Sequence, residues 1–384
     1  MKRVLIVLRN TYEELQKSVK YLGIIKTFSE LGFEVYYTYL EGNKVYINSN
    51  GNDSEIGNVV MKKLYRYTRN ISIYNAVTNF LQKTETVFDL CYIRSFPAMP
   101  GQKKMYRAIN HKCKRLVVEI PTYTKKSEIS SDKRFVRRIY KNVMDYIDKK
   151  NSKYVDLFAL IGEESNEYCG RPAVNICNGI DLSSIKIRNI KNTSPDTLNI
   201  LTVAKYCRWH GYDRLINGLI KYKKDGGNEH IIIHMVGPDG DGTLGELKKT
   251  VYDVGLGEDV VFYGPLYGEE INSLYDISDV AINSIGFHRI GINTFAFNLK
   301  LAEYIARGIP VACEMTEDSV GDEIPFLTKC IPADDTSVNM NDLILKIRED
   351  RKHPEHNKVM REYAEKNLSW KSQIEIILDG LGKE

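Results

Sequence analysis

Basic side chains gather on one short stretch in the second half of the chain. Lys205, Arg208 and His210 follow an apolar run and precede Gly211. Cations that share one loop can bind the oxygens of a phosphate group through charge-assisted hydrogen bonds. An ordinary solvated turn would have a similar composition. The spacing makes this loop the first candidate for an anion-binding site.

Two apolar runs further along the chain end at glycines. The first is followed by the glycine-rich stretch 237–242, where Gly237 lets the backbone approach a ligand closely. Many turns between a strand and a helix look like this, so the signal alone is weak. The second run ends at Tyr263 and Gly264, which could present backbone groups to a planar base.

A histidine beside an arginine lies between two glycines in the stretch 286–291. His288 and Arg289 there follow an apolar run over 280–283, and Asn293 comes shortly afterwards. Single histidines are usually structural or solvated. The pair between glycines nevertheless favours a loop that contacts a ligand.

A helix is predicted to begin near Asn298. The first backbone N–H groups of a helix have no acceptor within the helix, so those near Leu299 and Lys300 can bind an anion. Glu303 lies just over one turn further on, where its carboxylate could accept hydrogen bonds from a diol in the same pocket.

The first half of the chain offers fewer candidates. A buried strand is predicted over 115–120, and Pro121 opens a turn behind it, so Glu119, Thr122 and Tyr123 are expected to point into a cleft between domains. A core strand with a solvated end explains this stretch equally well.

Alternating strands and helices must position these residues. With 384 residues, the chain is long enough for two domains with separate cores. The alternation predicts an α/β protein of two Rossmann-like doubly wound domains that face each other across a cleft. The expected domains are residues 1–185 and 198–365, joined by a polar linker over 181–198, with a C-terminal helix in 366–384 that returns to the first domain. The helices predicted in the first domain are 12–31, 55–82, 99–110 and 133–150.

The candidate segments, in this order, resemble the nucleotide-sugar half of a glycosyltransferase of family 4, which has the GT-B fold. The most specific motif is Glu303 to Pro310, which matches the family pattern "E, A or Y, x, A, x, G, x, P". Where the family carries a Lys-Gly pair in the first loop, this chain has His210 and Gly211. The stretches 209–214, 288–289 and 119–123 resemble a bacterial group that makes surface polysaccharides, 178–181 resembles the close of the family's first domain, and 368–371 resembles the start of its last helix.

The resemblance implies a transferase that uses a nucleoside-diphosphate sugar, retains the anomeric configuration and needs no metal or cofactor. UDP-sugar is the expected donor in preference to GDP-sugar, and a glycan or polyprenyl-diphosphate-linked sugar is the expected acceptor. Lys205, Arg208 and Lys300 would then neutralise the diphosphate, and Glu119 would orient the acceptor. Phe295 stands where the family usually has a second glutamate. His288, Arg289 and Asn293 could replace its contacts with the sugar.

Charge is unevenly distributed along the chain. Residues 1–192 hold 33 Lys and Arg against 19 Asp and Glu, and residues 101–153 hold 16 against 5. The basic segment 101–153 could be a solvated helix face or could bind anionic lipid. No nucleic acid partner is expected.

The protein is expected in the cytoplasm, either free or bound peripherally to the inner face of the membrane. The seven cysteines contain no CxxC pair and suit reduced thiols. A nucleotide-sugar epimerase and a catalytically silent nucleotide-sugar-binding subunit remain the alternatives to a transferase.

Overall fold

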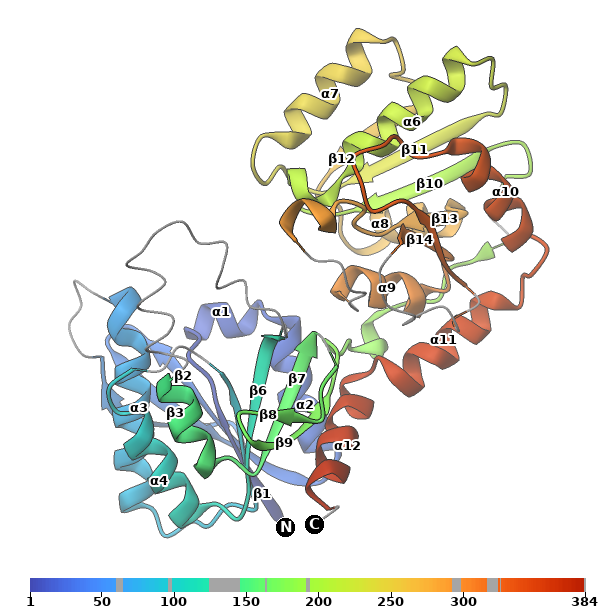
Figure 1. Ribbon diagram of the computed structural model, residues 1–384. Helices are drawn as coiled ribbons and strands as arrows, with labels where there is room; N and C mark the ends of the chain where they lie inside the picture. Colours follow the sequence, from blue (N-terminus) through green and yellow to red (C-terminus); the bar gives the residue numbers. More distant parts are fainter. Residues whose placement is uncertain are drawn as a thin grey trace. The chain divides into compact units, whose positions relative to one another are not determined.

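The computed structural model describes residues 1–59, 65–95, 99–123, 146–162, 164–190, 194–291, 298–315, 324 and 326–382. They form two compact units (Figure 1). Unit 1 comprises Met1–Ile180 and Trp370–Glu384, and unit 2 comprises Asp181–Ser369. Among the described residues, no helix combines the length and the apolar character needed to cross a membrane.

Unit 1 is built on a sheet with the strand order β4-β3-β2-β1-β5-β6-β7-β9-β8. From β2 to β9 the neighbouring strands run parallel, while β3, β4 and β8 are antiparallel to their neighbours. The strands are β1 (Lys2–Val7), β2 (Phe33–Glu41), β3 (Lys44–Ser49), β4 (Asn52–Asn58), β5 (Leu90–Arg94), β6 (Leu116–Tyr123), β7 (Leu157–Gly162), β8 (Glu167–Tyr168) and β9 (Arg171–Asn175).

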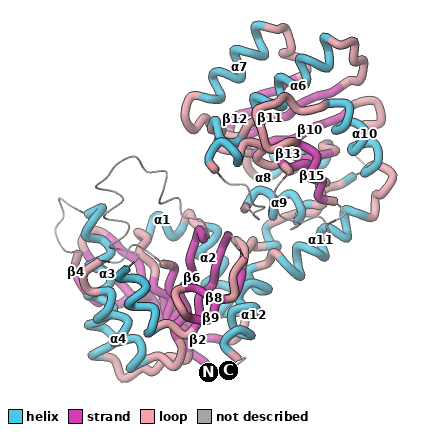
Figure 2. Tube along the Cα trace, viewed as in Figure 1, coloured by secondary structure: helices cyan, strands magenta, loops and turns pink. Residues whose placement is uncertain are grey.

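Helices cover both faces of this sheet (Figure 2). Alternate side chains of a strand point to opposite faces, so Leu5 of β1 packs with α3 and α4, while Val4 packs with α2 and α12. Each face therefore has its own apolar core. The elements are α1 (Tyr12–Gln16), α2 (Val19–Glu30), α3 (Tyr65–Lys83), α4 (Gln102–Lys112), η3 (Ser152–Tyr154) and α12 (Trp370–Leu381).

Unit 2 contains a six-stranded parallel sheet with the order β12-β11-β10-β13-β14-β15. Its strands are β10 (Leu198–Val203), β11 (Ile231–Val236), β12 (Val260–Gly264), β13 (Val280–Ile282), β14 (Val311–Glu314) and β15 (Leu327–Ile331). Its helices are η4 (Leu182–Ser184), η6 (Arg208–His210), α6 (Tyr212–Lys224), α7 (Thr243–Asp253), α8 (Gly268–Ile277), η7 (Phe287–Ile290), α9 (Leu299–Arg307), α10 (Met340–Asp350) and α11 (His356–Asn367). The strand order reverses between β10 and β13.

The prediction of two Rossmann-like doubly wound domains is confirmed. Two helix predictions in unit 1 were inaccurate. Residues 52–58 form β4, which pairs with β3 through the register Ser49 to Asn52, so the helix predicted over 55–82 does not begin at 55. The helix predicted over 12–31 is interrupted, because Ser18 accepts a hydrogen bond from the Tyr21 N–H and starts α2 as a separate helix. Most of the helix predicted over 133–150 lies outside the described residues.

The segment expected to be an exposed linker is part of unit 2. Arg188 donates from its backbone N–H to the Arg307 carbonyl at 2.8 Å and from Nε to the Gly308 carbonyl at 2.7 Å. Asn357 donates to the Arg188 carbonyl at 2.9 Å. A charged side chain that bonds backbone carbonyls holds this segment against α9 and α11, which the polar sequence did not indicate.

Candidate functional site

The reversal of strand order in unit 2 defines where a ligand is expected. In doubly wound sheets, ligands bind beyond the carboxyl ends of the strands at this point. The loop after β10 contains Lys205 and η6, and the loop after β13 contains η7. Gly211 has a φ of +73°, and a Cβ there would lie 2.6 Å from the Ile285 carbonyl oxygen. The glycine therefore allows the two loops to touch.

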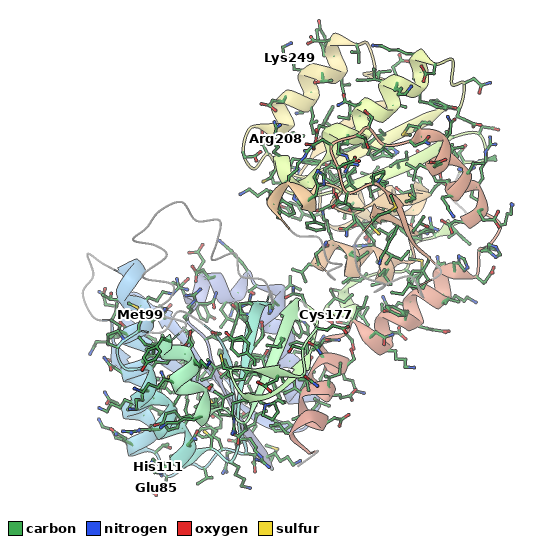
Figure 3. All side chains as sticks on the ribbon, in the orientation of Figure 1. Glu85, Met99, His111, Cys177, Arg208 and Lys249 are labelled. Atoms are coloured by element: carbon green, nitrogen blue, oxygen red, sulfur yellow. The ribbon has the colours of Figure 1, made fainter. Side chains whose placement is uncertain are left out.

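The cations of the first loop differ in burial. Lys205 and Arg208 are exposed, whereas His210 is buried. The Arg208 backbone N–H donates to Oδ2 of Asp241 at 3.0 Å, which fixes the backbone of the loop after β10. Arg208 is labelled in Figure 3. Two exposed cations thus remain available to a ligand from solvent.

Lys300 brings a further cation to the same point from the first turn of α9. Its Nζ donates to Ser284 Oγ at 2.7 Å, to Tyr212 Oη at 3.0 Å and to His210 Nδ1 at 3.1 Å. Desolvation lowers the pKa of Lys300 to about 7. No carboxylate is paired with this ammonium among the described residues. A half-buried cation held by neutral oxygens and nitrogens is suited to an incoming anion.

His210 completes this group as a neutral imidazole. Burial, and then the charge of Lys300, lower its pKa to about 3. Its Nδ1 lies 2.6 Å from Ser284 Oγ. Since Lys300 also donates to Nδ1, the neutral ring carries its proton on Nε2. His210 therefore orients Lys300 and adds no charge of its own near neutral pH.

The N-terminus of α9 lies beside these side chains. Asn298 caps the helix, accepting from the Leu301 N–H at 3.0 Å and donating to Asn283 Oδ1 at 2.9 Å. The N–H groups of Leu299 and Lys300 begin the helix and have no acceptor within it. The capped N-terminus of α9 and the ammonium of Lys300 therefore lie together where the sequence predicted an anion site.

Glu303 lies on α9, one turn beyond Lys300, with its side chain partly exposed. Its Oε1 accepts from Nε of Arg307 at 2.9 Å. Arg307 also donates to Asn272 Oδ1 at 2.7 Å and lies 3.9 Å over the ring of Tyr275. These contacts fix the carboxylate in one orientation and leave acceptor capacity for hydroxyl groups.

The predicted base-side residues lie at the ends of β11 and β12. Tyr263 donates to, or accepts from, Nδ1 of His234 at 2.9 Å, and burial lowers the pKa of His234 to about 4. The Gly237 N–H donates to the Gly264 carbonyl at 2.8 Å. A Cβ on Gly237 would lie 1.8 Å from the Ala204 carbonyl oxygen, so a glycine is required where β10 and β11 end.

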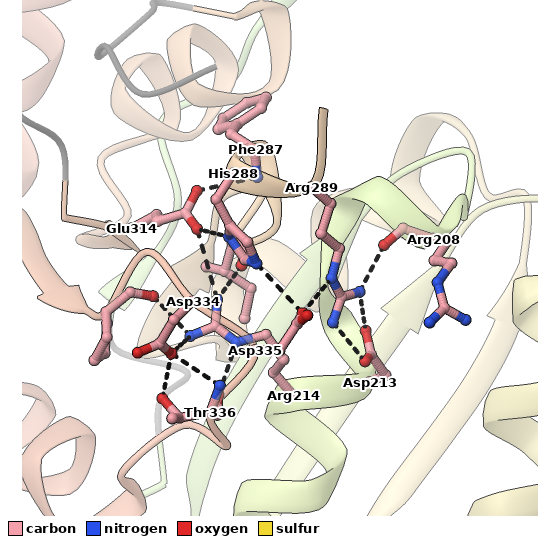
Figure 4. Close-up of polar contacts among 12 residues, drawn as sticks. Arg208, Asp213, Arg214, Phe287, His288, Arg289, Glu314, Asp334, Asp335 and Thr336 are labelled. Carbon is pink, nitrogen blue, oxygen red and sulfur yellow. Dashed lines mark hydrogen bonds and ion pairs between the residues drawn. The ribbon is translucent and has the colours of Figure 1, made fainter. Parts of the chain in front are cut away.

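His288 and Arg289, predicted to contact the sugar, form hydrogen bonds with other residues of the protein. Arg289 donates to both carboxylate oxygens of Asp213 at 2.7 and 2.8 Å, to Asp335 at 2.7 Å and to the Arg208 carbonyl at 2.8 Å (Figure 4). Hydrogen bonding to Asp213 raises the pKa of this guanidinium. Four of its five N–H donors bond to the protein, which argues against the predicted catalytic role.

His288 is held in the same network. Its Nδ1 bonds Oε1 of Glu314, and its Nε2 lies 3.3 Å from Oδ1 of Asp335. Glu314 is buried, accepts from the Phe287 N–H at 3.0 Å and lies 3.7 Å from Arg214. We therefore interpret His288 and Arg289 as residues that position the loop after β13.

Glu119 in unit 1 is also placed differently from the prediction. Its side chain is 0% exposed. Lys20 Nζ donates to Oε1 at 2.8 Å, Arg94 Nη1 donates to the same oxygen at 3.0 Å, and the Tyr92 hydroxyl bonds Oε2. Because these donors enclose its carboxylate, Glu119 cannot contact an acceptor sugar. It acts instead as the counter-ion of Lys20 and Arg94.

Several predicted residues fall where no side chain is described. Thr122 and Tyr123 belong to β6, but the structure describes only their backbone. Asn293 and Phe295 lie outside the described residues, as do residues 124–145 of the basic segment 101–153. The prediction that Asn293 contacts the sugar stays a prediction.

Ser284 and Tyr212 were missed by sequence reasoning although both contact Lys300. Neither has a motif of its own. Their position could have been found from the strand order, because β10 and β13 are neighbours. Ser284 follows β13, and Tyr212 follows the loop after β10.

A group of potential metal ligands lies elsewhere in unit 2. Within the described residues, ligand atoms of His353, Glu355 and His356 lie within 4.8 Å of one another. This group belongs to the connection between α10 and α11 and not to the loops after β10 and β13.

The whole fold resembles that of known glycosyltransferases. A glycosyltransferase from Rickettsia africae matches with a TM-score of 0.63 and 14% identity, covering 100% of this chain and 98% of that one. Alr3699/HepE from Anabaena in complex with UDP matches with a TM-score of 0.59 and 14% identity over 100% of both chains. WaaG, a glycosyltransferase involved in lipopolysaccharide biosynthesis, matches with a TM-score of 0.61 and 16% identity over 99% and 100%. The chain therefore has the GT-B fold.

A sequence comparison matches part of the chain to a known family. Residues 183–367 match the family described as Glycosyl transferases group 1. No curated protein sequence matches the chain.

Proposed function

We propose that this protein transfers a sugar from a nucleoside-diphosphate sugar to a glycan or polyprenyl-diphosphate-linked acceptor, with retention and without a metal, in the synthesis of a surface polysaccharide. The observation that carries the proposal is the position of Lys300. Its ammonium lies beside His210, Ser284 and Tyr212 at the strand-order reversal of unit 2, within the residues that match the family Glycosyl transferases group 1.

The donor diphosphate would bind between Lys300, the N–H groups of Leu299 and Lys300, and the exposed cations Lys205 and Arg208. As the bond from the sugar to the diphosphate breaks, negative charge develops on the leaving phosphate. Oriented donors and a partly desolvated ammonium stabilise that charge more in the transition state than in the ground state. The leaving group would thus be activated by charges of the protein.

The nucleoside would extend from the diphosphate toward Glu303 and Tyr263. The Glu303 carboxylate, held by Arg307, would accept hydrogen bonds from the two ribose hydroxyls. The backbone at Tyr263 and Gly264 would contact the base. The presence of UDP in the structure of Anabaena HepE supports a UDP-sugar as the first donor to test.

Incubation with a panel of radiolabelled UDP-, GDP-, ADP- and dTDP-sugars and a lipid-linked acceptor tests the proposal. Transfer from one donor, resistant to EDTA and lost in Lys300→Met, is the expected result. Conversion of the donor to another sugar would indicate an epimerase. Binding without transfer, hydrolysis or conversion would indicate a silent binding subunit. A transfer product with inverted anomeric configuration would contradict retention.

The proposed membrane association rests on the basic segment 101–153. Co-sedimentation with anionic vesicles should fall as salt is raised, because exposed charges are screened over about 10 Å at 0.1 M salt. Equal recovery with neutral and anionic vesicles would leave this segment a solvated surface.

A further inference from the structure

Two histidines and two carboxylates gather where α10 ends and α11 begins. The backbone N–H of His353 donates to the Asp350 carbonyl at 3.0 Å, and that of His356 donates to the His353 carbonyl at 3.0 Å. Turns of three residues place every third side chain on the same side of the chain. Ligand atoms of His353, Glu355 and His356 lie within 4.8 Å of one another. Residues 350–356 therefore bring together four side chains of the types that bind metals.

The separations between these side chains suit a tetrahedral ion. Nδ1 of His353 lies 3.0 Å from Oε1 of Glu355, and Nδ1 of His356 lies 3.9 Å from Oδ1 of Asp350. A tetrahedral zinc ion, with bonds of about 2.0–2.2 Å to nitrogen and oxygen, holds its ligand atoms about 3.3–3.6 Å apart. The two measured distances lie on either side of this range, so small rotations of the side chains would complete the site.

One buried ring nitrogen of this group, Nδ1 of His356, has no hydrogen-bond partner within the part of the chain that the structure describes. Buried polar atoms are nearly always bonded, so a buried nitrogen without a partner needs an explanation. The Asp350 carboxylate, at 3.9 Å, is too far away for a hydrogen bond. A metal ion between this nitrogen and the Asp350 oxygen would bind both atoms.

A cavity beside these side chains offers room for an ion. Asp350, His353 and His356 line a cavity of about 180 Å³. A water molecule takes up about 30 Å³ in the liquid. The cavity can therefore hold a metal ion together with bound water. Arg188 and Arg351 also line it.

The two arginines of the cavity bind other partners. Arg351 donates to both carboxylate oxygens of Asp279, at 2.9 and 2.8 Å. Arg188 donates from Nε to the Gly308 carbonyl at 2.7 Å and from Nη1 to the Ser278 carbonyl. These bonds orient both guanidinium groups toward partners outside the group of histidines and carboxylates.

The chemistry of the side chains indicates which ion would bind. Magnesium and calcium prefer oxygen ligands, whereas two imidazoles favour zinc. Two carboxylates would balance the charge of a divalent ion. We infer that the connection between α10 and α11 binds one zinc ion. Its ligands are Asp350, His353, Glu355 and His356.

The ion would have a structural role. His356 begins α11, and the next residue, Asn357, donates to the Arg188 carbonyl at 2.9 Å. A Cβ on Gly308, at the end of α9, would lie 2.9 Å from the Asn357 carbonyl oxygen, so α11 and α9 are in close contact there. A link between the end of α10 and the start of α11 would therefore hold α11 against α9. Because its ligands lie outside the loops after β10 and β13, the ion would take no part in the proposed transfer.

Competition with a chromophoric zinc chelator measures the zinc affinity of the full-length protein after treatment with EDTA. The parent should bind zinc at this site. His353→Gln and Asp350→Asn should each weaken binding by at least about 10- to 100-fold, the usual effect of losing even an outer partner of a metal ligand. His111→Gln, which replaces an exposed histidine of α4, should bind zinc like the parent. The seven cysteines are present in all four proteins, so they do not contribute to these differences.

Cobalt(II) binding and thermal unfolding provide independent measurements. Tetrahedral cobalt with nitrogen and oxygen ligands absorbs visible light, and its spectrum lacks the ultraviolet bands of bound thiolates. This spectrum should appear in the parent and be lost in His353→Gln. Zinc should raise the Tm of the parent and not of this variant, because the site exists only in the folded state. The His353 side chain is 43% exposed, so in EDTA the variant should unfold at the temperature of the parent.

Equal zinc affinity in the parent and in His353→Gln would overturn the site, as would the absence of saturable zinc binding in the parent. Unchanged affinity in Asp350→Asn would overturn the assignment of four ligands. Tighter binding of magnesium or calcium than of zinc would overturn the choice of ion. Thiolate bands in the cobalt spectrum of the parent would place the ion at the cysteines instead.

Discussion

Nζ of Lys300 lies 3.1 Å from Nδ1 of His210, across the contact between the α9 helix and the loop after β10. The family that this sequence resembles typically has a Lys-Gly pair where this chain has His210 and Gly211. Here the loop supplies a neutral acceptor, and α9 supplies the ammonium. A cation is therefore kept at this point of unit 2 although it comes from a different element.

Replacement of Lys300 should weaken donor binding. We expect Lys300→Met to reduce UDP affinity about 10- to 100-fold, because one charge-assisted contact contributes roughly 1.5 to 3 kcal/mol. Lys300→Arg should lose less, and Lys221→Met, an exposed lysine on α6, should lose nothing. Calorimetry measures all three. An unchanged dissociation constant for Lys300→Met would move the phosphates to another place.

The lowered pKa of Lys300 predicts that protons are taken up when UDP binds. At pH 8 a group with a pKa of about 7 is mostly neutral, and a bound diphosphate favours its charged form. UDP binding should therefore take up a fraction of a proton at pH 8 and weaken as pH rises above 7. Calorimetry in two buffers of different ionisation enthalpy measures the uptake. It should vanish in Lys300→Arg, and equal uptake there would assign the proton to another group.

The same lowered pKa has a consequence for stability, with a definite sign. An unfolded lysine stays protonated to about pH 10.4, so between pH 7 and that value the unfolded state holds more protons than the folded state. The contribution of Lys300 to the free energy of unfolding therefore rises with pH across this window. Urea denaturation of the parent and of Lys300→Met at pH 7 and pH 9 should show this rise in the parent only. A parallel pH dependence in both proteins would contradict it.

Glu303 should affect the nucleoside and not the diphosphate. Glu303→Gln removes the charge but keeps the shape, and we expect UDP affinity to fall about 10-fold while pyrophosphate affinity stays unchanged. Arg307 still has Asn272 and Tyr275 as partners, so the fold should persist. Competition of UDP and pyrophosphate for the site distinguishes the two ligands. A parallel loss of both affinities would place Glu303 at the phosphates or make it structural.

The sequence predicted those features of the site that depend on local order along the chain. The start of the α9 helix near Asn298 and the cations of the first loop follow from residue types and spacing. The burial of Glu119 could not be predicted, because its partners Lys20 and Tyr92 come from α2 and β5, far away in sequence.

The protein contacts of the loop after β13 could not be predicted for a related reason. His288 beside Arg289 has the composition of a ligand-binding loop, but the partners of these residues, Asp213, Glu314 and Asp335, lie on three separate segments. The 52–58 strand was missed because its polar residues pair with β3 only as a hairpin. Partners that are distant in sequence therefore determine whether a polar residue is available to a ligand or is bound within the fold.

Two glycines at neighbouring strand ends provide a test of the close contact between β10 and β11. A Cβ on Gly237 would lie 1.8 Å from the Ala204 oxygen, and the Gly237 φ is +136°. Ala204 cannot easily move, because its N–H donates to the Val236 carbonyl at 3.0 Å. Gly264 has a φ of +71°, but a Cβ there would meet nothing within 4 Å.

Gly237→Ala should therefore lower the free energy of unfolding by about 3 kcal/mol or more, since it adds a backbone clash to a strained φ. Gly264→Ala should lower it by only about 1 kcal/mol, the cost of the positive φ alone. Urea denaturation measures both variants, and the difference between them isolates the clash. Because Gly237 donates to the Gly264 carbonyl, the clash should also displace the backbone at Tyr263 and weaken UDP binding in Gly237→Ala more than in Gly264→Ala. Equal losses of stability in the two variants would mean that the end of β11 can shift away from Ala204.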